Sequence, residues 1–238
     1  MHAVPGAGPA TLNVSVDGSG VSSSAISFGN VAKSLEIDSG NANLTAAPGD
    51  GGDAVAEATE QLEDGRSYTV VALPEGNGEG AELRVFEDGK PRAGQARIRA
   101  IHAGPELGDP DIRVGDRTIA EKVAYADATD YVEVSPGTYD VKVTRAGGEG
   151  GELATKDDVP LTAGTATTAV VVGSRGEQTK IVTISDGTAA PPGAGPNTGF
   201  GGLADDGGGG PSRWVIALLF ALAAGMLGAT GWVLSGRR

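Results

Sequence analysis

The chain has 238 residues, and its 31 acidic and 18 basic side chains give a formal net charge of −13 at pH 7. Such a field repels phosphate backbones, so nucleic acid is excluded as an expected partner. With no cysteine, the chain has no disulfide framework, no thiolate nucleophile and no Cys-based metal site. Forty glycines and only 4% aromatic residues favour short strands joined by many turns.

The chain contains a tandem repeat. His2-Ala3-Val4-Pro5 recurs as His102-Ala103-Gly104-Pro105, and the closing pair Asp88-Gly89 recurs as Asp186-Gly187. Between these motifs the offset settles near 97 to 99, which matches Ile26, Phe28, Leu35, Ile37, Gly40 and Leu44 with Val123, Tyr125, Val132, Val134, Gly137 and Val141. The repeat predicts two domains, over residues 1–94 and 95–187.

The second copy predicts β structure most plainly. Tyr139, Val141 and Val143 alternate with polar residues, and two further strands are expected at 170–172 and 181–184. Short strands bounded by turn residues predict an all-β fold of two tandem β-sandwich domains. Apart from the C-terminal segment, Ala54 to Leu62 is the only candidate helix, and its counterpart, Glu152 to Leu161, contains Pro160.

The opening I-H-A-x-P, the following D-I-R-V and the later L-x-x-G-x-x-x-T-V-V-V pattern resemble the bacterial surface domain known as domain-of-unknown-function family 4397. The resemblance covers both copies, from residue 1 to about residue 188. It implies immunoglobulin-like or transthyretin-like sandwiches in exported proteins that are often duplicated and anchored. It implies no known activity.

The beginning of the first copy is shorter than that of the second. The segment 96–101 precedes His102 as an expected strand, whereas only Met1 precedes His2. No apolar stretch suited to a signal peptide occurs near Met1. We therefore expect the true start to lie upstream; the competing interpretation is a tail-anchored protein with cytoplasmic domains.

No constellation of residues predicts catalysis or a cofactor. His2 and His102 occupy equivalent positions, and each copy offers a single histidine, so we expect these side chains to satisfy backbone groups. Asp109, Asp111 and Asp116 are candidate calcium ligands because they place carboxylates in one loop region. A solvated acidic loop is the commoner outcome for such residues.

A Gly- and Pro-rich linker is expected over residues 188–212. Within it, Pro196-Asn197-Thr198-Gly199 is similar to the core of a Gram-positive sortase signal, although Gly195 stands where that signal has Leu. The resemblance implies cleavage between Thr198 and Gly199 and attachment to the cell wall. The alternative is a plain flexible stalk in which these four residues form a turn.

The last segment, 213–238, predicts a membrane anchor. Trp214 to Leu234 is a run of 21 residues without charge or proline, with Trp214 and Trp232 at its two ends. Such a run is long enough to cross a bilayer as one helix. Arg237 and Arg238 follow it and place the C-terminus in the cytoplasm, with the domains outside the cell membrane.

Taken together, these features predict a non-enzymatic surface protein that displays two sandwich modules for binding a wall polymer, matrix component or neighbouring protein. The alternatives are a carboxylate-based envelope hydrolase or enzyme accessory module, and a spacer without any ligand. An exposed cleft lined by converging acids of raised pKa would favour the hydrolase.

Overall fold

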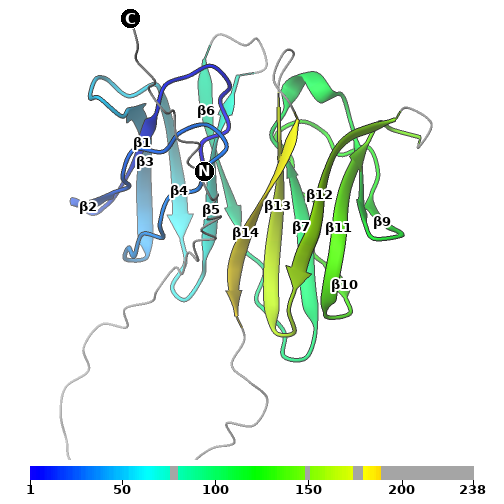
Figure 1. Ribbon diagram of the computed structural model, residues 1–238. Coiled ribbons are helices and arrows are strands. Elements are labelled where there is room, and N and C mark those ends of the chain that lie inside the picture. The colour runs from blue at the N-terminus through cyan, green and yellow to red at the C-terminus, as the bar shows by residue number, and fades with distance from the viewer. Residues whose placement is uncertain (76–79, 148–150, 174–178, 189–238) are drawn as a thin grey trace, which may run out of the picture.

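The computed structural model describes residues 1–75, 80–147, 151–173 and 179–188. These residues form fourteen β-strands and one short 3-10 turn, Pro105–Leu107, so the all-β prediction is confirmed for them. No helix within these ranges is long and apolar enough to cross a bilayer. The strands divide into two modules that stand side by side, β1 to β6 and β7 to β14 (Figure 1).

The first module is sandwich-like. A sheet with the order β2-β1-β3-β4 packs against the hairpin β5-β6. Alternate residues face inward, as in β3, where Ala42 and Leu44 are buried and Asn41 and Asn43 are exposed. The six strands are β1 (Ala10–Val16), β2 (Ser19–Ser22), β3 (Gly40–Pro48), β4 (Ala56–Leu62), β5 (Tyr68–Pro74) and β6 (Ala81–Glu87).

The second module packs a sheet with the order β10-β7-β13-β14 against a sheet with the order β12-β11-β8-β9. Its predicted strands are confirmed: β11 buries Val141 and Val143, and β13 and β14 contain the expected apolar runs. The eight strands are β7 (Ala96–His102), β8 (Asp111–Val114), β9 (Arg117–Ala120), β10 (Val132–Val134), β11 (Gly137–Thr144), β12 (Glu152–Leu161), β13 (Thr165–Val172) and β14 (Lys180–Thr188).

The candidate helix over Ala54 to Leu62 is wrong. Residues Ala56–Leu62 form β4, which pairs antiparallel with β3 in a continuous register. Both ends of β4, Ala56 and Leu62, are buried, while Glu57, Thr59 and Gln61 point to solvent. This alternation by two fits a sheet, and pairing with β3 overrides the helix propensity of Ala, Glu and Gln.

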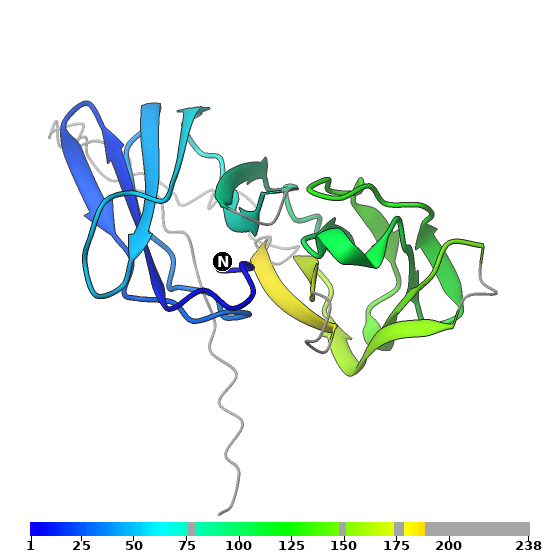
Figure 2. The same cartoon turned by 90° about the horizontal axis from the view of Figure 1, so that it is seen from above.

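The two modules share a third core. It lies between β5-β6 of the first module and the β10-β7-β13-β14 sheet of the second, and Figure 2 shows the N-terminus between the modules. The repeat makes its members equivalent in pairs, one from each module: Met1 and Ile101, Ala3 and Ala103, Val71 and Val170, Leu73 and Val172, Phe86 and Ile184. Because equivalent residues meet from both sides, the interface has the self-complementary character of a two-fold contact.

An aromatic side chain of each module reaches across the margin of this core. Phe28 lies under the ammonium group of Lys180, 4.7 Å from ring centroid to Nζ. Its counterpart Tyr125 reaches across the interface in the other direction and donates to the main-chain oxygen of Pro74. Phe28 and Tyr125, which the repeat matches, are both half-buried and pack against the shared core at the boundary between the modules.

Several sequence-based predictions lie outside the described residues. These are most of the linker, the sortase-like Pro196, Asn197, Thr198 and Gly199, and the anchor with Trp214, Trp232, Arg237 and Arg238.

The shared core predicts that the two modules unfold together. Leu73 is fully buried in this core, so Leu73→Ala should lower the free energy of unfolding by about 2–5 kcal/mol. Urea unfolding can be monitored by the hydrogen exchange of peptides from both modules. Peptides from the two modules should give the same midpoint, and Leu73→Ala should shift that midpoint equally in each module. Val55→Ala, at a side chain 53% exposed, is the control and should change stability by less than about 0.5 kcal/mol. Separate midpoints for the two modules would contradict the shared core.

Candidate functional site

A polar network lies beside the shared core and repeats the symmetry of the modules. In the first module the hydroxyl of Thr69 donates to Oδ1 of Asp88 over 2.7 Å. In the second, the hydroxyl of the equivalent Thr168 donates to Oδ2 of Asp186, also over 2.7 Å. Asp88 directly follows β6, and Asp186 lies in β14. Each module therefore contributes one Thr-Asp pair, in which Thr69, Asp88 and Thr168 are buried and Asp186 is half-buried.

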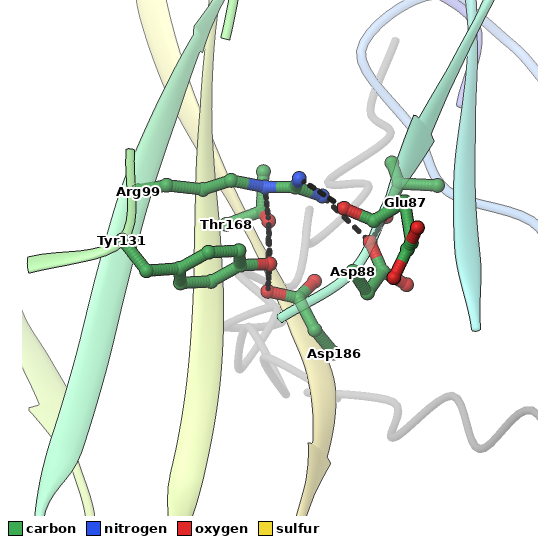
Figure 3. A network of polar contacts seen from close by, with 7 residues as sticks. Glu87, Asp88, Arg99, Tyr131, Thr168 and Asp186 are labelled. Carbon is green, nitrogen blue, oxygen red and sulfur yellow. Dashed lines mark hydrogen bonds and ion pairs between the residues drawn. The ribbon is translucent and has the colours of Figure 1, made fainter. Parts of the chain in front are cut away.

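Arg99 of β7 connects the two pairs (Figure 3). Its Nε donates to the Thr168 hydroxyl over 2.8 Å, and its terminal nitrogens donate to Oδ1 of Asp88 and to the main-chain oxygen of Glu87 over 2.6 and 2.7 Å. The side chains of Arg99 and Asp88 are each only 5% exposed. Arg99 is therefore a buried cation that reaches from the second module into the first.

Tyr131 completes the network from the loop before β10. Its hydroxyl donates to Oδ2 of Asp186 over 2.8 Å, and its ring lies 4.7 Å from the Arg99 guanidinium carbon. Gly89 permits this placement, because a Cβ there would lie 2.7 Å from carbons of the Tyr131 ring. The ring therefore packs directly on the backbone that follows Asp88.

The network holds two carboxyl groups, and the pKa of each is raised above its ordinary value. Burial, and then the charge of Asp186, raises the pKa of Asp88 to about 6, against the opposing effects of Thr69 and Arg99. Burial likewise raises the pKa of Asp186, opposed by hydrogen bonds from Thr168 and Tyr131. Burial and Asp186 raise the pKa of Tyr131, so its phenol remains a hydrogen-bond donor.

A groove of about 620 Å³ opens next to the network, lined mainly by residues of the first module. We call it the β5 groove. One wall is the edge of β5 at Tyr68 and Val70, and the other is the segment 31–39; Asp88 and Asp186 also line it. Leu44 and Leu62 of the first module's core lie in its lining, so the groove gives access to that core.

The two histidines occupy the backbone-satisfying positions expected of them. Nδ1 of His102 lies 3.1 Å from the main-chain oxygen of Val123, and Nε2 of His2 lies 2.9 Å from that of Gly8. Burial lowers the pKa of His102. Both side chains are buried at the ends of parallel strand contacts, His2 beside Ala72 and His102 beside Val171.

Two of the three candidate calcium ligands, Asp111 and Asp116, make hydrogen bonds to other groups of the protein. Both carboxylate oxygens of Asp111 accept main-chain N–H groups, from Lys122 over 2.9 Å and from Gly147 over 3.0 Å. Asp116 accepts Arg113 through its main-chain oxygen. Across the described ranges, no three His, Cys, Asp or Glu side chains are grouped to hold a metal ion, and Asp109 joins no such group.

The sequence pattern did not predict the network. The repeat pairs Asp88-Gly89 with Asp186-Gly187, and these were recognised only as the closing residues of the two copies. The overlooked signal is Arg99, a charged residue between Ile98 and Ala100 in a strand whose other positions are mostly buried. A charge in a nearly continuous apolar run needs a buried partner, and the repeated acids were the available partners.

Fold and site together define an all-β protein of two sandwich-like modules joined by a shared core and a buried ionic network. The chain belongs to the family described as "Domain of unknown function (DUF4397)", whose model matches residues 1–113 and 100–197. The two matches agree with the tandem repeat. No curated protein matches the chain.

Two solved structures share a distant likeness with the chain, and both are described as a "putative cell adhesion protein". One, from Bacteroides uniformis ATCC 8492, has 12% identity and a TM-score of 0.25, with 76% of this chain and 93% of that chain covered. The other, from Bacteroides fragilis NCTC 9343, has 11% identity and a TM-score of 0.21, with 77% and 86% covered. Neither likeness is close enough to indicate the function of this chain.

The buried acid of the first module predicts a pH-dependent stability. Because the pKa of Asp88 rises from 3.8 to about 6 on folding, the folded state binds the extra proton. The contribution of Asp88 to stability is therefore full below pH 3.8 and is lost as the pH rises through about 6. Asp88→Asn removes this titration, so its stability relative to the wild type should increase over that interval, as measured by urea unfolding at each pH. Asp64→Asn, on the exposed surface, is the control; a difference that stays constant with pH would contradict the assignment.

Proposed function

We propose that the chain is a non-enzymatic protein of the bacterial cell surface that displays its two β modules, as one rigid unit, for binding or adhesion. The observation that carries this proposal is the apolar run from Trp214 to Leu234 behind a Gly-rich linker. A single membrane-spanning helix at this position, followed by Arg237 and Arg238, would hold the modules on the outer side of the membrane.

The proposed organisation follows the sequence: sandwich domains over residues 1–94 and 95–187, a linker over 188–212 and an anchor over 213–238. The sandwiches are proposed to be immunoglobulin-like or transthyretin-like. The segment Pro196 to Gly199 would serve either as a stalk or as a sortase signal that transfers the modules to the cell wall. A Gram-positive envelope suits the second use.

The shared core supports a role in binding. Modules that bury a common apolar face keep a fixed relative orientation, so surfaces formed by both are held ready for a partner. A chain of independent spacers would not need the ionic contact of Arg99 with Asp88 across the module boundary. This favours a preformed binding unit over a simple spacer.

A carboxylate hydrolase is the second candidate, favoured by the raised pKa values of Asp88 and Asp186 beside the β5 groove. However, Oδ1 of Asp88 already accepts both Thr69 and Arg99, and its side chain is 5% exposed. Oδ2 of Asp186 accepts Thr168 and Tyr131. Acids engaged in this way are suited to holding the modules together, so we favour the binding role.

Protease treatment of intact cells tests the proposed location. If the modules lie outside, added protease should cleave within the linker and release fragments of residues 1–188 into the medium, detected by mass spectrometry. A cytoplasmic protein of the same cells, intact until lysis, is the control. Protection of residues 1–188 in intact cells, followed by digestion after lysis, would contradict surface display.

An assay on envelope glycans and peptides separates the two candidate functions. The binding role predicts no turnover by the wild type above the level of the Asp88→Asn, Asp186→Asn double variant. Turnover that the double variant loses would favour the hydrolase.

A further inference from the structure

The four sheets of the described chain are stacked, and this leaves one outer face at each end of the stack. The shared core lies between β5-β6 and the β10-β7-β13-β14 sheet, and the core of each module lies on either side of it (Figure 2). The two end layers are therefore the β2-β1-β3-β4 sheet of the first module and the β12-β11-β8-β9 sheet of the second. Each turns one side away from its core.

The outer face of the β2-β1-β3-β4 sheet consists almost entirely of uncharged hydrogen-bonding side chains. The strand register sets them in rows across the sheet. Asn13 lies between Ser22 and Thr45 in one row, and in the next row Asn43 lies beside Thr59. We call this surface the amide face. Its members are half-buried or exposed, and Glu57 is the charged one among them: Thr11, Asn13, Ser15, Ser22, Asn41, Asn43, Thr45, Glu57, Thr59 and Gln61.

Asparagine is an unusual residue at these positions. It is depleted in β-strands, because its short polar side chain competes for main-chain hydrogen bonds. Nevertheless three of the six asparagines of the chain, Asn13, Asn41 and Asn43, lie on the amide face, and residues 95–187 contain none. The first copy of the repeat thus places amide groups on one surface against the preference of its strands. This indicates a use for them other than folding.

The second module has different chemistry at the equivalent positions. Asn13 of β1 lies opposite Thr45 of β3. In the same register of the second module, Arg113 of β8 lies opposite Lys142 of β11. The same fold therefore accepts a charged outer face in one copy and an uncharged one in the other. The uncharged character of the amide face is a property of the first copy alone and is not required by the sandwich.

The side chains of the amide face are held in place and keep hydrogen-bonding capacity. The hydroxyl of Ser22 donates to Oδ1 of Asn13 over 2.6 Å, and the hydroxyl of Thr59 donates to Oδ1 of Asn43 over 3.3 Å. The amide N–H groups of Asn43 have no hydrogen-bond partner among the residues that the structure describes. Because an amide offers two donors as well as an acceptor oxygen, the face presents donors and acceptors in a fixed pattern.

We propose that the amide face binds an extended, uncharged polysaccharide chain. Sugar hydroxyls both donate and accept hydrogen bonds, as do the amides and hydroxyls of this face. A net charge of −13 repels acidic polymers, and the amide face has no basic side chain to offset that repulsion. An uncharged partner rich in hydroxyl groups is therefore the one that fits. This inference names the ligand class for the proposed binding function and rests on it.

The flatness of the face favours a long ligand over a single sugar. No aromatic ring belongs to the amide face, so the affinity comes from hydrogen bonds, each of which contributes little on its own. Neighbouring strands lie about 4.8 Å apart, and a linear glycan laid across them meets a new side chain at each strand. Affinity should consequently rise with the number of sugars.

Nuclear magnetic resonance of the purified full chain, labelled in nitrogen and kept in a detergent without sugar groups, is the direct test. Maltohexaose, cellohexaose and chitohexaose are the uncharged probes. At least one should shift the side-chain amide signals of Asn13, Asn41, Asn43 and Gln61. The signal of Asn30, which lies next to His2 outside the face, should stay unchanged. The same hexaose should bind at least about tenfold more tightly than its disaccharide, because each added sugar makes further hydrogen bonds.

A matched pair of variants gives the second arm. Asn43→Asp replaces the amide donors by a charge of nearly the same shape, and Thr59 can still donate to it. This variant should weaken binding of the hexaose at least about tenfold. Asp140→Asn is the reverse exchange at the counterpart position in β11 and should change binding less than about twofold. Urea midpoints equal to that of the wild type would separate lost binding from lost folding.

Three results would overturn the proposal: no shift of the face amides with any hexaose at about 10 mM, equally tight binding of a galacturonate hexamer, or equal weakening by Asn43→Asp and Asp140→Asn. Face signals that shift with protein concentration alone would assign the surface to a second copy of the chain and would overturn it as well. Because these measurements use the purified chain, they can fail while protease treatment still supports surface display, and the reverse also holds.

Discussion

The structure depends on burying one apolar face that neither module can cover alone. Val71 and Leu73 of β5 and Val170 and Val172 of β13 point away from their own sandwich cores and toward each other. A sheet face of this kind is stable only when another layer covers it. The tandem repeat supplies that layer, because two copies of one face are complementary when related by an approximate two-fold axis. The duplicated modules thus form one unit.

The same symmetry explains the ionic network and its imbalance. Each module brings a Thr-Asp pair to the boundary, and among the described residues the arginine comes from the second module. Arg99 donates to Thr168 of its own module and to Asp88 of the other. Burial favours the protonated form of both acids, and the charge of Asp186 adds to this effect at Asp88, so the pKa of each carboxyl group is raised. The network and the β5 groove are therefore two aspects of one asymmetry at the position of β7.

The sequence predicted the repeat, the all-β class and the strands around Val141, Val170 and Ile181, because regular alternation and repeated spacing are local properties. It misassigned Ala54 to Leu62, since the exposed residues of β4 have helix propensity and only pairing with β3 makes them a strand. The site was beyond prediction for another reason. The two equivalent acids belong to different modules, and only their docking across the shared core brings Asp88 within reach of Arg99.

Hydrogen exchange at two equivalent amides, in a chain that begins at Met1, tests the central claim, which is a symmetric pair of modules whose described residues differ at the strand position of β7. The amide of Thr167 faces β7, whereas the amide of its counterpart Tyr68 faces the β5 groove. In that chain we expect Thr167 to be among the most protected amides and Tyr68 to exchange at least about a hundredfold faster. Equal protection at the two positions would show that the first module already holds its edge strand, and would contradict the account.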